Sequence, residues 1–379
     1  MREGVTNPRR ILVASLDWPQ TAYLVAALHD AGHQVTLVTT GRHDALGLAR
    51  YCEQVRSPAP EAPHYGEFLR AAIFRCGAEL VLPVSEPVME RLWEMDPPCA
   101  VAIYPDLAPH QRALMRDRRR LYERAVTIGV PVAPWVPLAN AAALDGAIAA
   151  LGLPLVLRGT QGRGGTQVRI VATRAEAARA LEFLFRHSPG EPFAQRFIDG
   201  DCCLIGGVLE RGEMLRYFAH ELIEAHPPLT GPSIRIRSLR DETLTACARS
   251  LFRDLASEGI ACAEFMRDRR GAYTLIEVNP RPWGSIEAAR RCGVDLCKVF
   301  AERLAGAPLT GPADYEPGVE CVLFPRFLVA RWASGAHLTL RDLRHAGRSV
   351  GSVPWRHPGL ALHLLRRAYR ELTGERPLG

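Results

Sequence analysis

A glutamate, an asparagine and an arginine spaced two residues apart are the side chains of this sequence best suited to chemistry. Residues 275–278 read as a buried strand that contains Glu277 and continues into Asn279 and Arg281. Side chains alternate between the two faces of an extended chain, so these three are predicted to point the same way. Two oxygen ligands beside a fixed guanidinium form a site for a divalent cation and for the phosphates that the cation carries.

A second carboxylate joins this set through a predicted hairpin. Glu264 lies near the end of an apolar run, and residues 267–271 have the composition of a tight turn that leads into the strand at 275–278. The hairpin places Glu264 beside Glu277, where two like charges need a cation between them or one raised pKa. The alternative is a surface hairpin with scattered charges, but a Glu inside an apolar run is rarely unpaired.

These segments resemble the metal-binding end of ATP-grasp ligases. Residues 263–265 and 275–285 are similar to the matching parts of carbamoyl-phosphate-synthetase-type members, biotin carboxylase and D-alanine–D-alanine ligase, and the order of motifs covers roughly residues 10 to 310. The resemblance implies that Mg²⁺ ions, or Mn²⁺ in their place, are held on the phosphates of ATP by Glu264, Glu277 and Asn279. It also implies that Arg281 is catalytic and contacts phosphate or an acyl-phosphate intermediate.

The same resemblance implies an α/β chain with the ATP-grasp fold. Its parts would be a Rossmann-like N-terminal lobe at 1–112, a small lid subdomain that binds nucleotide at 113–200, a larger mixed α+β subdomain with the metal site at 201–310, and a C-terminal extension at 311–379. The implied activity joins a small-molecule carboxylate to an amine through an acyl phosphate, with ADP and phosphate as products. A homodimer is left open, since dimers are common in the family.

Two arginines are candidate contacts for the phosphates of ATP. Arg118 follows Asp117 ahead of a Gly-Val-Pro break at 129–131, within a predicted helix over 112–128, and Arg158 ends a predicted strand at 153–158. The family uses lysine at both places. Of 47 basic residues only Lys298 is lysine, so a preference for arginine throughout the chain explains both replacements. A solvated charged run is the alternative for the segment around Arg118.

A glycine-rich loop follows Arg158 and leads into a returning strand at 168–171. Glycine permits close approach of the backbone, so successive N–H groups can face phosphate oxygens. The family builds a flexible lid over ATP here. The candidate contacts are Gly162, Gly164, Gly165 and Thr166. A plain hairpin loop is the alternative.

Residues 192–200 resemble the family's adenine-binding hinge. Gln195 matches a family Glu or Gln, and the backbone at Arg196 and Ile198 matches the edge that reads adenine. The family's ribose-binding Glu is replaced by Cys202, which leaves the adjacent Asp201 as a candidate substitute.

Two further arginines are candidate catalytic residues. Arg235 and Arg237 alternate with isoleucines, so both are predicted on one face of a strand. Either guanidinium could hold a carboxylate or phosphoryl group by a bidentate contact. A solvated strand face is the alternative.

The first part of the chain reads as β-α-β units and predicts a parallel sheet. A strand followed by a turn is expected at 9–18, a helix at 20–31, and further strands at 34–39, 80–84 and 100–104. No Gly-x-Gly-x-x-Gly follows the first strand, so a dinucleotide site and a nicotinamide dehydrogenase are poorly supported. Ligands gather at the carboxyl ends of such strands. The polar residues there are Ser15, Asp17, Ser85 and Glu86, and caps of the following helices are an equal alternative for each.

The composition bears on whether the protein is a membrane protein, a secreted protein or a nucleic-acid-binding protein. No apolar run reaches the ~20 residues of a membrane helix, and no secretory pattern opens the chain. Ten scattered cysteines predict reduced thiols and a cytoplasmic location. A net charge of +6 without a nucleic-acid-binding motif gives no reason to expect a nucleic-acid partner. The segment 361–373 could form a basic amphipathic helix, either packed on the body or in contact with an acidic partner or membrane.

The runner-up function is a non-catalytic nucleotide- or metabolite-binding module on the same fold. The two missing lysines and the missing ribose Glu motivate it. The intact set of Glu264, Glu277, Asn279 and Arg281 favours a ligase, because a binding module would not need it.

Overall fold

The structure, a computed structural model, describes most of the chain. The described residues are 7–16, 19–40, 48–96, 101–161, 167–226, 228, 231–323, 326–335, 339, 362 and 366. The predicted features outside them are Asp17, the glycine-rich loop at 162–166 and nearly all of the predicted helix at 361–373. No helix within these ranges is both long and apolar enough to cross a membrane.

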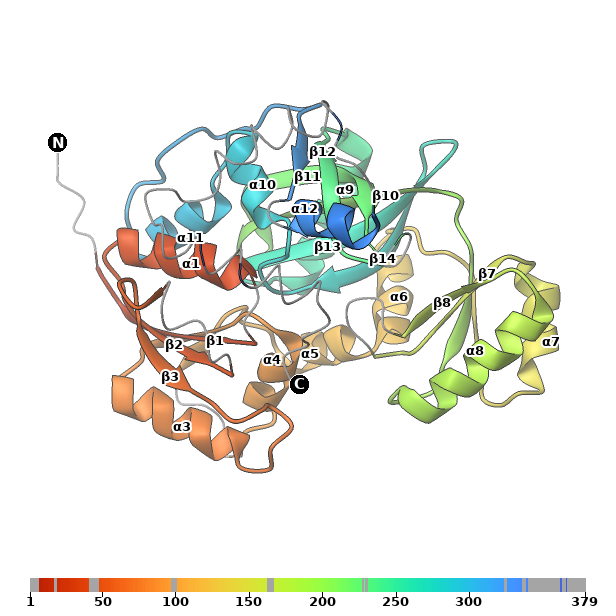
Figure 1. Ribbon diagram of the computed structural model, residues 1–379, viewed down its shortest axis with the longest axis horizontal. Coiled ribbons are helices and arrows are strands. Elements are labelled where there is room, and N and C mark those ends of the chain that lie inside the picture. The colour runs from red at the N-terminus through yellow and green to blue at the C-terminus, as the bar shows by residue number, and fades with distance from the viewer. Residues whose placement is uncertain are drawn as a thin grey trace.

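The N-terminal lobe is a parallel sheet with helices on both faces, as predicted (Figure 1). Its strands are β1 (Arg10–Ser15), β2 (Gln34–Thr39), β3 (Glu53–Arg56), β4 (Leu80–Pro83) and β5 (Ala102–Ile103), in the spatial order β3-β2-β1-β4-β5. Its helices are α1 (Pro19–Asp30), α3 (Tyr65–Cys76) and α4 (Glu86–Trp93). The strand order reverses between β1 and β4, and ligands of such sheets bind at that reversal, beyond the carboxyl ends of the strands.

The predicted single helix over 112–128 is wrong, because the chain forms α5 (Pro109–Arg116) and α6 (Arg118–Thr127) instead. Asp117 lies between them in an extended conformation, and its side chain accepts a hydrogen bond from the backbone N–H of Arg119 at 2.9 Å. An Asp in this position caps a new helix. The break makes Arg118 the first residue of α6, and the proposed domain boundary at residue 112 falls inside α5.

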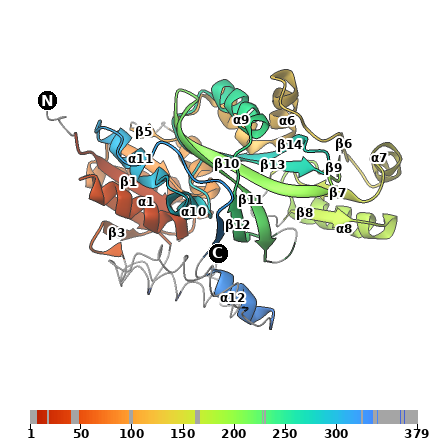
Figure 2. The ribbon, with the colours of Figure 1, turned by 90° about the horizontal axis from the view of Figure 1, so that it is seen from above.

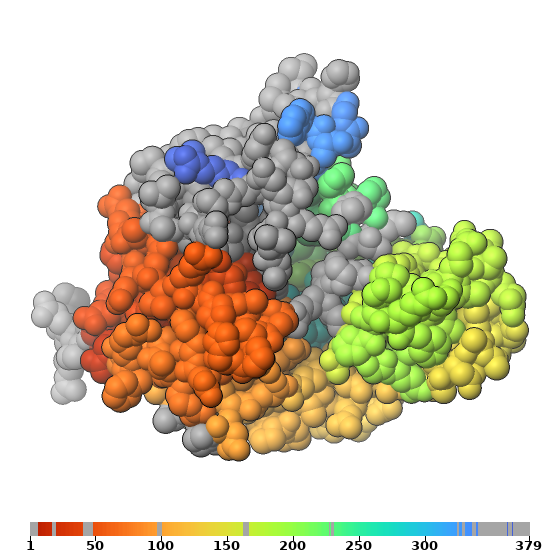
Figure 3. All heavy atoms as spheres, turned by 60° about the horizontal axis from the view of Figure 1, so that its bottom comes forward, coloured from red at the N-terminus to blue at the C-terminus, as the bar shows by residue number. Residues whose placement is uncertain are grey.

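The segment predicted as the lid forms a four-stranded antiparallel sheet with its own core. It contains β6 (Trp135–Pro137), α7 (Ala143–Leu151), β7 (Leu155–Arg158), β8 (Val168–Val171), α8 (Arg174–His187) and β9 (Phe193–Arg196). Helix α8 begins with a capping box in which Thr173 and Glu176 satisfy each other's backbone N–H groups. Figure 3 shows this part of the chain as a separate lobe beside the N-terminal lobe.

The largest sheet is antiparallel, in the order β14-β13-β10-β11-β12-β15. Its strands are β10 (Gly200–Glu210), β11 (Glu213–Ala225), β12 (Ser233–Ser238), β13 (Gly259–Asp268), β14 (Tyr273–Asn279) and β15 (Glu320–Val322). Its helices are α9 (Glu242–Leu255), α10 (Ile286–Arg291), α11 (Leu296–Leu304) and α12 (Arg326–Ala333).

The two faces of the large sheet have different partners. One face packs against α9 and α6. The other face shares a continuous hydrophobic core with α10, α11 and the N-terminal lobe, where α1 packs on α11 (Figure 2). Glu264 and Glu277 belong to this second face, because Ile260 and Cys262 of the same strand lie in its core and side chains alternate along a strand. The site therefore lies on the face that the N-terminal lobe covers.

Candidate active site

The two predicted carboxylates are direct cross-strand neighbours. In the antiparallel register of β13 and β14, Glu264 pairs with Glu277. Directly opposite residues of an antiparallel pair have Cβ atoms about 5 Å apart on the same face. Asn279, two residues beyond Glu277, shares that face and is buried at 8% exposure. The hairpin thus brings together the three oxygen-bearing side chains that the sequence singles out.

The two carboxylates differ in protonation because their surroundings differ. Burial, and then the charge of Glu277, raise the pKa of Glu264. Burial also raises the pKa of Glu277, but the positive charges of Arg118 and Arg158 outweigh it and leave that pKa lowered. Near neutral pH the protein therefore carries one ionised and one protonated carboxyl group at this position.

Arg118 and Arg281 donate hydrogen bonds to the oxygen atoms that could bind a metal ion. Arg118 Nη2 donates to Glu277 Oε2 at 2.9 Å, and Asn279 Nδ2 donates to Glu277 Oε1 at 3.0 Å. Arg281 Nη2 in turn donates to Asn279 Oδ1 at 3.2 Å. Within the described residues no group of three His, Cys, Asp or Glu side chains could hold a metal, so the amide of Asn279 would complete the set. Two carboxylates and an amide oxygen are the donor chemistry that Mg²⁺ takes.

Arg158 is the third arginine at the site, and it is almost fully buried at 4% exposure. Its Nη1 donates to Tyr122 Oη at 3.0 Å and to Gln195 Oε1 at 3.3 Å, and Tyr122 donates to the carbonyl of Ile276 at 2.7 Å. Burial lowers the pKa of Arg158. Sequence reasoning missed Tyr122, because nothing in its helix distinguishes it from a core residue.

Two buried donor atoms, one on Arg158 and one on its neighbour Gln195, have no acceptor among the described residues. They are Arg158 Nε and Gln195 Nε2. A buried donor without a partner costs about 1–3 kcal/mol, so native proteins rarely keep one without a reason. Both atoms belong to residues that the sequence assigns to nucleotide contacts, and the acceptor oxygens and ring nitrogens of a nucleotide would satisfy them.

The remaining hinge residues lie around the end of β9. Arg196 is exposed, and its backbone N–H donates to the carbonyl of Pro134 at 2.9 Å. Ile198 is half-buried between β9 and β10. Of the four predicted loop contacts, Gly162, Gly164, Gly165 and Thr166, none lies within the described residues.

Asp201, Arg235 and Arg237 are engaged elsewhere. Side chains alternate along β10, so Cys202 shares the face of Glu264 while Asp201 faces the other way, where Arg267 Nη2 contacts it at 3.1 Å. Arg237 donates to Glu221 at 2.7 Å and to Glu320 at 2.6 Å.

Arg235 lies over the ring of Phe327 at 5.3 Å and has Glu224 at 3.6 Å. The structure therefore groups Arg281, Arg118 and Arg158 with the carboxylates and gives Asp201, Arg235 and Arg237 partners of their own.

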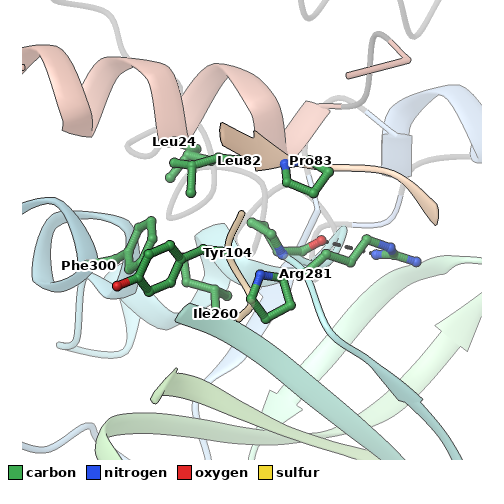
Figure 4. Close-up of a pocket in the computed structure, with 9 residues that line it drawn as sticks. Leu24, Leu82, Pro83, Tyr104, Ile260, Arg281 and Phe300 are labelled. Atoms are coloured by element: carbon green, nitrogen blue, oxygen red, sulfur yellow. Dashed lines mark hydrogen bonds between the residues drawn. The ribbon is translucent and has the colours of Figure 1, made fainter. Parts of the chain in front are cut away.

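Glu86 of the N-terminal lobe contacts the site by accepting a hydrogen bond from Arg281. Arg281 Nε donates to Glu86 Oε1 at 2.6 Å, and Arg281 Nη1 donates to the carbonyl of Pro282 at 3.0 Å. Figure 4 shows Arg281 at the edge of an apolar pocket between the lobes, lined by Leu24, Leu82, Pro83, Tyr104, Ile260 and Phe300. From the sequence, Glu86 is predicted only to be a polar residue near the carboxyl end of a strand.

His220 and Ser285 fix the far end of the segment that carries Arg281. His220 Nε2 and Ser285 Oγ lie 2.9 Å apart, and both residues are buried. His220 shares the face of Glu264, since both pair with Leu204 of β10 from opposite sides. No motif in the sequence signals this pair, because 65 residues separate its members.

Acid is expected to weaken the fold through His220. Burial lowers the pKa of His220 to about 4, so between pH 6.5 and pH 4 the unfolded chain binds a proton that the folded chain does not. Stability is then lost as pH falls, by about 3 kcal/mol over that range. Urea unfolding at pH 7 and pH 5 should show the wild type losing about 2 kcal/mol more than His220→Gln, which keeps a polar group for Ser285. Equal losses in the two proteins would refute this assignment.

Comparison with known proteins finds chains of similar sequence and structures of similar fold. No family model matches the chain. Carbamoyl phosphate synthase large chains from Methanoculleus marisnigri and Methanoregula boonei are each 27% identical to it, over 262 and 265 residues. Each match covers 62% of this chain and 24% of the relative, so the chain spans about a quarter of the length of these curated relatives.

Solved structures match over most of the chain. An N5-carboxyaminoimidazole ribonucleotide synthetase in complex with ADP has a TM-score of 0.68 at 15% identity, covering 84% of this chain and 83% of that one. Biotin carboxylase from Campylobacter jejuni has a TM-score of 0.68 at 16% identity, covering 82% and 74%. L-amino acid ligase from Bacillus licheniformis has a TM-score of 0.61 at 17% identity, covering 80% and 76%. The ATP-grasp fold predicted from the sequence is thus confirmed by its similarity to these structures.

Proposed function

We propose that this chain is an ATP- and Mg²⁺-dependent ligase that joins a carboxylate to an amine. The observation that carries the proposal is the cross-strand pair of Glu264 and Glu277, with Asn279 and three arginines within one cluster. Among the structural neighbours, the 2-oxoglutarate carboxylase biotin carboxylase domain of Hydrogenobacter thermophilus is described as a dimer with MgADP, ADP and bicarbonate. A nucleotide, a divalent cation and a homodimer are accordingly part of the proposal.

The proposed reaction activates the carboxylate before the amine attacks. A carboxylate oxygen attacks the γ-phosphorus of ATP, the bond to the bridging oxygen breaks, and ADP leaves. The resulting acyl phosphate has phosphate as its leaving group, so the amine nitrogen can attack the acyl carbon. The C–O bond to phosphate then breaks, and the nitrogen loses its proton to give an amide. Phosphoryl transfer of this kind depends on positioning and charge neutralisation more than on covalent help from the protein.

Each member of the cluster has a place in this scheme. Glu264, Glu277 and Asn279 would hold Mg²⁺, which when bound neutralises the charge of the phosphates. Arg158, held by Tyr122 and Gln195, presents a buried guanidinium where phosphate charge is to be stabilised.

Arg118 and Arg281 form hydrogen bonds with two of the residues proposed to bind Mg²⁺. Arg118 pairs with Glu277, and Arg281 pairs with Asn279. Phosphate oxygens are alternative partners for both guanidinium groups. When a nucleotide binds, the two arginines can bond its phosphates instead, which leaves the oxygens of Glu277 and Asn279 available to the cation.

A non-catalytic nucleotide-binding homologue is the second candidate. The observation that favours it is the same set of hydrogen bonds, since Arg118 and Arg281 already occupy oxygens of Glu277 and Asn279. A chain that only binds nucleotide could keep this arrangement permanently.

Release of ADP separates the two candidates. The protein is incubated with MgATP and a panel of amino acids and small carboxylates, alone and in pairs, while ADP is followed. A ligase is expected to release ADP only when an acceptable carboxylate is present, and faster when its amine partner is added. Nucleotide binding without turnover in every pairing would support the binding module instead.

A further inference from the structure

Glu86 is the one charged residue that the N-terminal lobe is seen to contribute to the described cluster. It is the first residue of α4 and directly follows Ser85 beyond the end of β4, at the reversal of strand order between β1 and β4. Its side chain is 22% exposed and pairs with Arg281. The carboxylate therefore lies where parallel sheets bind ligands and also faces the catalytic cluster of the large sheet.

Two oxygens at this position lack hydrogen-bond partners among the described residues. They are Glu86 Oε2 and Ser85 Oγ, both buried, and Ser85 as a whole is 0% exposed. Arg281 uses the other carboxylate oxygen, Oε1. Helix α4 does not use the hydroxyl either, because Ser85 at its N-cap makes no side-chain capping bond. A buried carboxylate oxygen and a buried hydroxyl on adjacent residues, both without partners, can accept from a donor group that carries positive charge.

The pairing of Arg281 with Glu86 is also one that the proposed reaction would disturb. A transferred phosphoryl group is a stronger partner for Arg281 than a single carboxylate, because it is more highly charged. Once Arg281 turns towards phosphate, Glu86 is a half-buried anion that needs another cation. The remaining reactant, an amine, is a cation near pH 7.

We propose that Glu86, assisted by Ser85, binds the amino group of the nucleophile in its ammonium form and so selects amines over uncharged nucleophiles. This inference rests on the proposed ligase function and adds to it a residue and a charge requirement. The ammonium group donates to Glu86 Oε2 and to Ser85 Oγ, the two oxygens that lack donors. Because only the neutral amine attacks, the bound ammonium releases one proton to water before the C–N bond forms. The N-terminal lobe then supplies the nucleophile, while the large sheet and the lid supply the activated carboxylate.

The test compares charged and uncharged nucleophiles in Glu86→Gln. The amino acids that support turnover in the panel are ammonium ions near pH 7, whereas hydroxylamine is uncharged there and captures an acyl phosphate as a hydroxamate. In Glu86→Gln the KM for the amino acid should rise about 10- to 100-fold, which corresponds to losing a hydrogen bond to a charged group. The KM for ATP and the rate of hydroxamate formation should change less than about threefold.

A purely structural role for Glu86, exerted through Arg281, would slow both nucleophiles equally, and that result would overturn the proposal. An unchanged KM for the amino acid would overturn it as well. Glu94→Gln is the matched control, because Glu94 follows the same helix, is half exposed and pairs with Arg91 and Arg116. Thermal unfolding checks that each variant is folded. If Glu86→Gln does not fold, Ser85→Ala replaces it, with an expected rise in amino acid KM of about threefold.

The outcomes separate this inference from the function on which it rests. If the wild-type protein forms neither ADP nor hydroxamate with any carboxylate, the ligase function fails and the inference fails with it. If the wild type forms hydroxamate but Glu86→Gln treats charged and uncharged nucleophiles alike, only the inference fails.

Discussion

Replacing Glu277 by Gln is expected to lower turnover about a thousandfold while the protein stays folded. Glu277 lies at the centre of the cluster, with Arg118 on one oxygen and Asn279 on the other, and its lowered pKa keeps it ionised. A glutamine keeps the size of the side chain and one oxygen but removes the negative charge that a divalent cation requires. The phosphates would then react without the charge neutralisation that the proposed mechanism needs.

The measurement is ADP release as a function of Mg²⁺ concentration, with circular dichroism and thermal unfolding on the same samples. Glu320→Gln is the matched control, because Glu320 has a side-chain exposure of only 10% and pairs with Arg237 away from the cluster. It should lose stability without losing turnover. An unchanged rate in Glu277→Gln would remove the metal assignment, and equal loss of activity in both variants would point to unfolding.

Replacing Gly206 by Ala is expected to destabilise the fold by about 2–3 kcal/mol and to disturb the segment that carries Arg281. A Cβ atom at Gly206 would lie 2.5 Å from Cys262 Cβ, 2.7 Å from the carbonyl oxygen of Ala261 and 2.8 Å from Trp283 Cη2. A backbone carbonyl inside a paired strand cannot move aside cheaply. The indole of Trp283 would also be displaced, two residues after Arg281.

Urea unfolding measures the stability of this variant, and the KM for ATP together with kcat measures the effect on the site. Gly146→Ala is the matched control, since a Cβ atom there meets nothing within 4 Å and the residue lies inside α7. It should be neutral or stabilising by about 0.5–1 kcal/mol. The packing argument would fail if Gly206→Ala were as stable as the wild type.

Much of the site could be predicted from the sequence because its geometry is local. A hairpin of two strands fixes that Glu264 lies opposite Glu277, and alternation fixes that Asn279 shares their face. The second relation depends on the strand period alone, whereas the first also needs the β-bulge between Glu264 and Phe265, which shifts the register by one residue. The parallel N-terminal sheet was predictable for a similar reason, since each β-α-β unit is read from one continuous segment.

Other features could not be read from the sequence, because the contacts that decide them do not follow from the helix or strand period. The helix break at Asp117 involves a capping hydrogen bond and a bond from the Arg118 backbone N–H to the carbonyl of Thr160, a residue distant in the sequence. Asp201 and Arg237 stay predictions from residue type, and only the strand register reveals Arg267, Glu221 and Glu320 as their partners.

The sequence by itself determined which oxygens and which guanidinium groups are available, and the fold class that carries them. Only the tertiary structure decided how they are completed. Glu86 meets Arg281 across 195 residues, Tyr122 meets Arg158 across 36, and Trp283 lies over Gly206. Such contacts follow from how one sheet packs against another lobe and how strands are ordered. Neither relation leaves a period or a motif in the chain, because each depends on surfaces that form only after the local elements exist.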